Sequence, residues 1–276
     1  MDASLNIPVP TFVLHAICVI EQDLNQDCLV TWAYPSTDKF IPSEVLLQRT
    51  PFKNPVLAQS LEQHEEKYFL FSRFDNNWHY TLQTNLLNHA TLKAFAIVII
   101  AKDYNPEKYQ AMTSLFAQCY SQEMSCVKLV QMFLSVFGTG KYGSEFASQV
   151  YDENKAKIGG IGLQGVVKIF GAEQSTLIWA AMLMKKRIIV VSEHVEDLQQ
   201  ITRALPCFTW HRQQWEIVKP LVNFSHEVET NDVKSSAIYV AGTLDTNVKS
   251  DTKLYDLLLD ISSQRVHIAE QARGIC

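Results

Sequence analysis

The sequence predicts an α/β protein of two lobes, and three observations support this fold class. The first half alternates apolar runs with polar turns. Residues 138–161 are rich in Gly, Ser, Lys and Glu and lack periodicity, and beyond them a β-branched run at 187–192 lies between apolar helical segments. A chain of 276 residues can form two modest domains. We therefore expect an upstream α+β lobe at 1–137, a linker at 138–161 and an α/β lobe at 162–276.

The upstream lobe is expected to contain an antiparallel sheet. Two pairs of apolar runs separated by polar turns predict two hairpins, and a fifth run that is apolar on both faces predicts a covered strand. Ser43 is placed to cap a short helix between the hairpins. The five predicted strands are Phe12–Ile20, Leu29–Tyr34, Tyr68–Phe74, Trp78–Leu82 and Lys93–Lys102.

Two helices should follow the fifth strand. Asn105 can cap the first, with Pro106 at its first position, and the second should end at Gly138 or Gly140. The expected buried stripes are Tyr109, Met112, Phe116 and Cys119 on the first helix and Val127, Val130, Leu134 and Phe137 on the second. The resulting order, ββαβββαα, is that of longin-like modules, in which one helix covers one sheet face and two cover the other. Such modules typically bind proteins.

The second lobe is expected to be a three-layer α/β unit with a mostly parallel sheet. A helix should end at Gly171, and the helix over 177–184 is apolar all round, which predicts packing on every side. Strand 187–192, helix 195–205 and strand 215–218 predict a parallel pair with a right-handed crossover. The remaining strand candidates are 237–241 and 254–261, the latter ambiguous with helix. Predicted inward positions are Leu163, Val166, Val167 and Phe170 on the first helix and Val195, Leu198, Ile201 and Leu205 on the crossover helix.

Composition argues against several functional classes. A net charge of -5 and a pI near 5.9 disfavour nucleic acid as a partner. The longest apolar runs fall short of the ~20 residues that span a bilayer, and the N-terminus has no basic segment before its apolar strand, so a cytoplasmic protein is expected. The six cysteines show no C-x-x-C spacing and are better interpreted as small buried thiols than as disulfides or a metal cage.

No motif predicts a cofactor, a metal site or a catalytic residue. The segment "GIGLQG" at 160–165 matches G-x-G-x-x-G, but "DENKAKI" precedes it and lysines occupy the position of the ribose-binding acid. "GTGKYGS" has Ser135 in place of the first glycine of a phosphate loop. The eight histidines have no zinc-site spacing, and no serine lies in G-x-S-x-G. An enzyme using the glycine cluster is the least favoured hypothesis.

Two segments have both a structural and a binding interpretation. "WHRQQW" at 210–215 can be a pair of half-buried tryptophans beside a solvated loop, or a binding edge, where Trp and Arg are enriched. "MKKRI" at 184–188 fits a solvated helix end, where cations suit the negative pole, better than a docking patch.

Several segments resemble the DENN domain family. They are "AYPS" (33–36), "AKDYNPEKY" (101–109), "LMKKRIIVV" (183–191), "TRALPCFTWHRQQW" (202–215), "YVAG" (239–242) and "KLYDLLLDI" (253–261). The resemblance follows the family's order along nearly the whole chain. It implies a longin-like upstream lobe, a central α/β lobe and a downstream helical part that should extend beyond Cys276 and is here expected to be truncated.

The resemblance also implies a function. Members of the family are guanine-nucleotide exchange factors for Rab-type small GTPases, and the resemblance suggests a cytoplasmic protein recruited peripherally to late endosomes, with the Commander endosomal sorting complex as a possible partner. The alternative is a non-catalytic Rab-binding or endosomal adaptor with the same fold. In the family the GTPase docks between the lobes, so by position the candidate contact residues are Tyr34, Pro35, Ser36, Trp210, His211 and Arg212.

Overall fold

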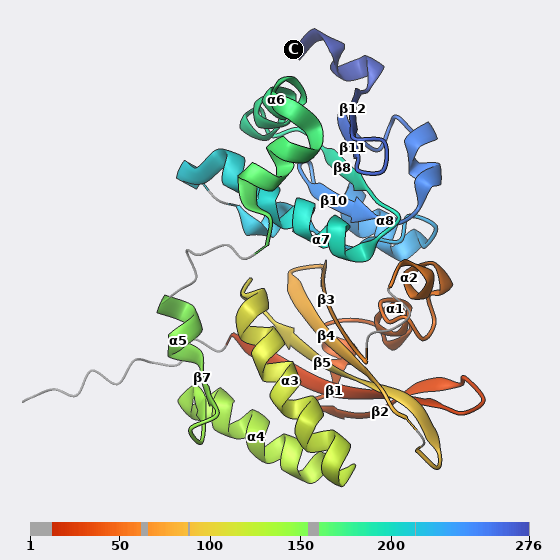
Figure 1. The fold of residues 1–276 in the computed structure, drawn as a ribbon, viewed down its shortest axis with the longest axis vertical. Helices are drawn as coiled ribbons and strands as arrows, with labels where there is room; N and C mark the ends of the chain where they lie inside the picture. The colour runs from red at the N-terminus through yellow and green to blue at the C-terminus, as the bar shows by residue number, and fades with distance from the viewer. Residues whose placement is uncertain (1–12, 62–65, 88, 154–159, 213, 276) are drawn as a thin grey trace, which may run out of the picture.

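A computed structural model describes residues 13–61, 66–87, 89–153, 160–212 and 214–275, which form two lobes stacked along the long axis of the molecule (Figure 1). The lower lobe contains a sheet of order β2-β1-β5-β4-β3 in which all neighbours are antiparallel. This confirms the predicted sheet, although Phe12 lies outside the described residues. The strands are β1 (Leu14–Asp23), β2 (Cys28–Tyr34), β3 (Lys67–Phe74), β4 (Asn77–Asn85) and β5 (Leu92–Ala101).

Helices cover both faces of the lower sheet. Because side chains alternate along a strand, Ile17 and Ile97 point to the face covered by α3 and α4, whereas Cys18 and Val98 point to the face covered by α1. The one-plus-two arrangement of helices is therefore present, with the short α2 as an addition near the upper lobe (Figure 1). The helices are α1 (Ser43–Gln48), α2 (Pro55–Ser60), α3 (Pro106–Glu123) and α4 (Cys126–Thr139), and the 3-10 turn η1 (Thr37–Lys39) precedes α1.

The predicted helix starts hold for α3 but not for α1. The side chain of Asn105 accepts a hydrogen bond from the Lys108 amide at 3.3 Å, and Pro106 begins the helix, as predicted. For α1 the cap position is Pro42, and Ser43 is already in the first turn. The Ser43 hydroxyl donates to Asp38 at 3.4 Å instead, so it links the helix to η1.

The predicted stripe on α4 was wrong. Val127 and Leu134 are exposed, and Phe137 is only partly buried. The buried positions are Leu129, Met132, Phe133 and Val136, which have the helical spacing i, i+3, i+4, i+7 but lie on another side of the helix. Because apolar residues occupy most of the circumference of this helix, periodicity alone could not choose between the two stripes.

The segment 138–161, expected to be a linker, begins with ordered structure. Strands β6 (Lys141–Tyr142) and β7 (Phe146–Ala147) form a small hairpin, and α5 (Ser148–Glu153) follows. Asp152 of α5 accepts from Lys108 of α3 at 3.4 Å, which ties this helix to the lower lobe. Residues 154–159 lie outside the described part of the chain.

The upper lobe is a three-layer α/β unit, as predicted. Its sheet has the order β12-β11-β8-β10-β9, with every neighbouring pair parallel except β11 and β12. Helices α6 and α7 pack on one face, and α8 packs on the other. The elements are α6 (Gly162–Leu183), β8 (Ile188–Val191), α7 (Val195–Ala204), η2 (Leu205–Arg212), η3 (Trp215–Ile217), β9 (Val218–Lys219), α8 (Glu227–Lys234), β10 (Val240–Thr243), η4 (Thr246–Ser250), β11 (Leu257–Asp260), β12 (Arg265–Ile268) and η5 (Glu270–Ile275).

Three details of this sheet differ from the sequence expectation. Strands β8 and β9 are parallel but not neighbours, because β10 inserts between them. The segment 215–218 is mostly the 3-10 turn η3, and β9 has only two residues. The ambiguous segment 254–261 contains a strand, β11, and pairs with β12, which was not predicted because its alternation is short and polar.

Helix α6 is less buried than predicted. Gly171 has φ 76°, a conformation suited to glycine, so it interrupts the helix as expected, but a second helical stretch resumes directly after it. Before the break, Val166 and Phe170 are buried while Leu163 and Val167 are exposed. After it, Trp179 and Met184 are also exposed, so the helix is not packed on all sides. Within the described residues, none of the helices combines the length and the apolar character needed to cross a bilayer.

The two lobes share one hydrophobic core. A single cluster of buried side chains includes Ile97 and Phe116 of the lower lobe and Ile188 and Leu198 of the upper lobe. Of the cysteines, Cys18, Cys28, Cys119 and Cys207 are buried and Cys126 is partly buried, all as free thiols, while Cys276 lies outside the described residues.

A carboxylate directly before β11 makes the stability of the upper lobe depend on pH. Burial alone would raise the pKa of Asp256, but the hydrogen bonds and charge of Arg187, at 2.9 Å, outweigh burial and lower the pKa. A lowered folded-state pKa adds stability above the ordinary carboxyl value of about 4, and this contribution is lost as the pH falls through the folded pKa. We expect the free energy of unfolding, measured by urea titration from pH 6 to pH 2, to fall less steeply with acid in Asp256→Asn. Glu193→Gln, at an exposed carboxylate, should keep the wild-type slope.

Candidate functional site at the lobe junction

The lobes meet where the edge strands of the two sheets approach each other. β3 ends one sheet and β9 ends the other. The carbonyl of Phe71 on β3 accepts a hydrogen bond of 2.7 Å from the Gln199 side chain on α7, so the upper lobe satisfies a backbone group of this edge. Arg203, one turn further along α7, donates to Glu107 of α3 at 2.6 Å. Helix α7 therefore fixes the position of the upper lobe against both β3 and α3.

Three aromatic rings cross the junction. Tyr104, which follows β5, stacks on Trp215 of the upper lobe with ring centroids 4.5 Å apart and an interplanar angle of 15°. Trp78 of β4 packs against Tyr104 at 4.7 Å. Such pairs stabilise by about 0.5–1.5 kcal/mol beyond the area that they bury. Trp215, the second tryptophan of "WHRQQW", is thus a structural contact between the lobes.

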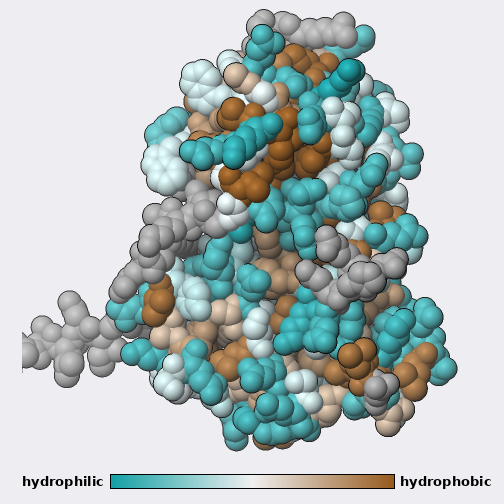
Figure 2. All heavy atoms as spheres, in the orientation of Figure 1, coloured by the Kyte–Doolittle hydropathy of each residue, from teal (hydrophilic) through white to brown (hydrophobic). Residues whose placement is uncertain are grey.

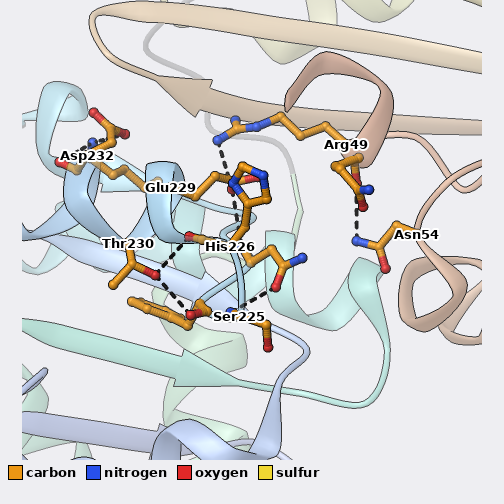
Figure 3. A network of polar contacts seen from close by, with 11 residues as sticks. Arg49, Asn54, Ser225, His226, Glu229, Thr230 and Asp232 are labelled. Atoms are coloured by element: carbon orange, nitrogen blue, oxygen red, sulfur yellow. Dashed lines mark hydrogen bonds and ion pairs between the residues drawn. The ribbon is translucent and has the colours of Figure 1, made fainter. Parts of the chain in front are cut away.

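A buried ion pair closes the junction on its other side (Figure 3). Arg49, at the end of α1, donates to Glu229 of α8 at 3.0 Å, and their side chains are 4% and 2% exposed. The same Glu229 oxygen accepts from the Asn223 amide at 3.1 Å. Nε and Nη1 of Arg49 have no hydrogen-bond partner in the structure. Taking both charges out of water costs free energy, so the pair adds little net stability. Its main contribution is to fix the position of α8 relative to the end of α1, because each buried charge needs the other.

Further cations surround this pair. Lys219 of β9 is 3% exposed and donates to Asp232 at 2.5 Å, yet burial outweighs that partner and lowers the pKa of the lysine. Burial also lowers the pKa of Arg73, although the charge of Asp232 opposes the shift. His79 is fully buried beside Arg49, and burial followed by the charge of Arg49 lowers its pKa well below the usual value. The imidazole of His79 is therefore neutral at pH 7.

A hollow of about 350 Å³ opens beside the Arg49–Glu229 pair. The lower lobe contributes its α1–α2 segment, including Arg49 and Asn54, and the upper lobe contributes the loops after β9 and β10, including Ser225, Asp245 and Asn247. Ser225 donates to Asp245 at 3.1 Å, so the polar groups of this rim are ordered among themselves. Residues from both lobes thus form one concave surface.

A second hollow, of about 330 Å³, lies on the α7 side of the junction. Phe69 and Phe71 of β3 form its apolar floor, while Gln110 of α3 and Gln200 and Arg203 of α7 form its polar walls. The two hollows therefore flank the same contact between the lobes. A partner that fills either one touches both lobes at once.

The residues Tyr34, Pro35 and Ser36 lie at the end of the outer strand β2. The ring of Tyr34 is 38% exposed and packs edge-on against Phe133 of α4 at 5.9 Å. The Ser36 side chain accepts from the Asp38 amide and caps η1. Their partners belong to the lower lobe, and other residues line the two hollows described above.

The residues Trp210, His211 and Arg212 lie in η2, at the carboxyl end of α6. Arg212 donates to the carbonyls of Met182 and Leu183 at 3.0 and 2.5 Å, which caps α6, and Trp210 is 62% exposed. The partners of these residues and those of Tyr34–Ser36 thus belong to different elements. Whether either segment contacts a GTPase stays a prediction.

The junction residues Arg49, Glu229, Gln199 and Tyr104 were missed by sequence reasoning. Charged and polar residues are usually exposed, so neither Arg49 nor Glu229 signals burial, and 180 positions separate them. One signal was available for Tyr104, since an aromatic residue between a buried strand and a capped helix has little room to point into solvent. In the segment "KDYNP" (102–106), Tyr104 stands between the end of the strand and the start of the helix.

Both lobes contribute surface at the junction. In the described part of the chain no three His, Cys, Asp or Glu side chains gather in an arrangement able to hold a metal ion. The glycine segment 160–165 starts α6, and the element described before it is the helix α5. The pairs Arg49–Glu229 and Lys219–Asp232 are buried at the junction, which suits a rigid docking surface.

The sequence of the chain is similar to three curated proteins named DENN domain-containing protein 10. The protein from Dictyostelium discoideum is 34% identical over 280 residues, which span 94% of this chain and 73% of that protein. The chain belongs to the DENN domain-containing protein 10 family. Its relatives from Danio rerio and Homo sapiens are 32% and 31% identical, covering 95% of this chain in both cases and 74% and 72% of their own lengths. The profile of a family described as "Stabilization of polarity axis" also matches, at residues 165–270 of this chain.

Proposed function

We propose that the chain is a guanine-nucleotide exchange factor for a Rab-type small GTPase. The observation that carries the proposal is membership of the DENN domain-containing protein 10 family, combined with a junction where both lobes line each of two hollows. Exchange needs no acid, base or metal from the factor. It needs a surface that binds the nucleotide-free GTPase more tightly than the nucleotide-bound form.

The required difference in affinity fits a protein interface. Moving a two-state equilibrium from 1:99 to 99:1 takes about 5.5 kcal/mol of preference for one state. A standard interface buries about 800 Å² on each partner, which is enough to fill one of the hollows and cover the contact between the lobes beside it. Because Gln199 and Arg203 of α7 hold that contact in place, the surface is formed before the GTPase arrives.

The alternative is an adaptor that binds the GTPase without accelerating release. Late-endosomal recruitment and association with the Commander complex belong to the same proposal and rest on the family alone. For either function the GTPase would contact the lobe junction, and only the rate of nucleotide release separates the two.

The proposal is tested by mixing the chain with a panel of Rab proteins loaded with a fluorescent nucleotide. We expect accelerated release from at least one of them. Gln110→Arg places bulk at the α7-side hollow and Asn247→Arg at the hollow beside Arg49, both at exposed positions. At least one of these variants should slow release about tenfold or more, because a charge forced into an interface core is poorly tolerated.

Lys141→Glu is the matched control, because Lys141 is exposed on β6 of the lower lobe, outside both hollows. It should release nucleotide at the wild-type rate. Binding of a Rab without faster release would favour the adaptor. If the chain neither binds any Rab of the panel nor accelerates release from it, both proposed functions are contradicted.

A further inference from the structure

Large apolar side chains are exposed where α6 ends. Trp210 is 62% exposed, Trp179 47% and Met184 39%. On the face shown in Figure 2, hydrophobic side chains gather over α6 and the neighbouring β12 of the upper lobe. A tryptophan exposed to this degree forgoes the free energy of burying its ring. Two such residues near one helix end therefore indicate a binding surface.

The two tryptophans belong to α6 and η2, which contact each other. Trp179 and Leu183 are four residues apart and therefore lie on the same side of α6. Arg212 of η2 donates to the carbonyls of Met182 and Leu183, which fixes η2 against this end of the helix. Trp210 is two residues from Arg212, so it lies beside the last turn of α6.

Basic residues border these apolar side chains. Lys185 and His211 are exposed, and Lys186 is partly exposed. Arg187 is not counted, because it is paired with Asp256. Two lysines thus follow the exposed Met184 directly, although the chain as a whole has a net charge of -5. We name this set the tryptophan–lysine surface: Trp179, Met184, Lys185, Lys186, Trp210 and His211.

We propose that the tryptophan–lysine surface binds an anionic lipid bilayer. Indole rings favour the boundary between headgroups and acyl chains, because one edge is polar and the rest apolar. Lysines beside them attract the negative surface of PS- or PI-containing leaflets and extend their ammonium groups toward it. The surface thus supplies both of the contributions that hold a peripheral protein on a membrane, and it does so independently of the lobe junction.

The shape of the surface favours a bilayer over a protein partner. Hot spots of protein interfaces fill well-packed pockets. The hollow that adjoins this surface, lined by Met184, Lys186, Asp256 and Ile268 among others, encloses about 20 Å³. That space is small for an anchoring side chain. Rings that protrude without a receiving pocket fit a fluid interface, which adapts to their shape.

Co-sedimentation with vesicles tests the proposal. We expect the chain to pellet with phosphatidylcholine vesicles containing about a third phosphatidylserine, and to pellet much less with phosphatidylcholine alone or at high salt. Lys185→Glu with Lys186→Glu should weaken binding to the anionic vesicles by at least tenfold. Trp179→Ala with Trp210→Ala should weaken it to a similar degree and also reduce the blue shift of tryptophan emission on binding.

Lys93→Glu with Lys141→Glu is the matched control, since both lysines are exposed on the lower lobe and the change in net charge is the same. It should bind like the wild type. Circular dichroism and thermal melting of every variant separate loss of binding from loss of fold. The proposal is overturned if the chain does not bind anionic vesicles, or if the control loses binding as strongly as the lysine variant. It is also overturned if the tryptophans instead mediate self-association in sedimentation velocity, or binding to an acidic polypeptide such as polyglutamate but not to vesicles.

Discussion

Glu229→Ala is expected to lower the free energy of unfolding by about 3–5 kcal/mol, because it leaves the buried guanidinium of Arg49 without a counter-charge. The Asn223 amide loses its acceptor in the same variant. Stability is measured by urea titration followed by tryptophan fluorescence. Among the described residues, two nitrogens of Arg49 already lack hydrogen-bond partners, so removing the carboxylate also takes the acceptor of the third.

Two further variants show whether the cause is the buried charge. Glu227→Ala removes an exposed carboxylate from the first turn of the same helix and should cost less than about 1 kcal/mol. Arg49→Leu combined with Glu229→Leu removes both charges and should recover most of the lost stability, since apolar replacement of a buried pair is often neutral. Equal effects of Glu227→Ala and Glu229→Ala would contradict the role assigned to the pair.

Gly242→Ala is expected to destabilise the upper lobe by about 3 kcal/mol, at the upper end of the usual cost of overpacking. A Cβ on Gly242 of β10 would lie 2.5 Å from the carbonyl oxygen of Pro220 and 3.0 Å from side-chain carbons of Leu198 and Thr202. The first contact is with backbone, so relief requires β10 to move away from the chain that follows β9. Thermal melting by circular dichroism measures the loss.

Gly138→Ala is the control for this prediction, because an added Cβ there meets no atom within 4 Å. Gly138 lies in the last turn of α4, where alanine has the higher helix propensity, so this variant should keep or slightly raise the melting temperature. A melting temperature for Gly242→Ala equal to that of the wild type would show that β10 and the Pro220 segment can separate at no cost.

Local signals in the sequence predicted much of the fold. Asn105 and Pro106 start α3 where expected, and the run at 93–102 forms the central covered strand β5. Each of these features depends on neighbours within a few residues. The buried side of α4 was missed because most sides of this helix are apolar. In such a helix the spacing of apolar residues does not show which side faces the core. The insertion of β10 between β8 and β9 was missed because strand order depends on long-range packing.

Less of the candidate site could be predicted. The family resemblance indicated a junction between lobes, but its chemistry depends on pairs such as Arg49 with Glu229 and Tyr104 with Trp215, which are more than a hundred positions apart. Nothing in either residue of such a pair identifies the other. The exposure of Trp179 was also not predicted, because an apolar helix seen as sequence gives no sign of which side its neighbours leave open.

The continuous core across the two lobes has an evolutionary consequence. Since Ile97 and Phe116 belong to the same buried cluster as Ile188 and Leu198, recombination that joined one half of this gene to the other half from a distant relative would create mismatched side chains along the shared boundary. We therefore expect substitutions on the two sides of that boundary to be coupled.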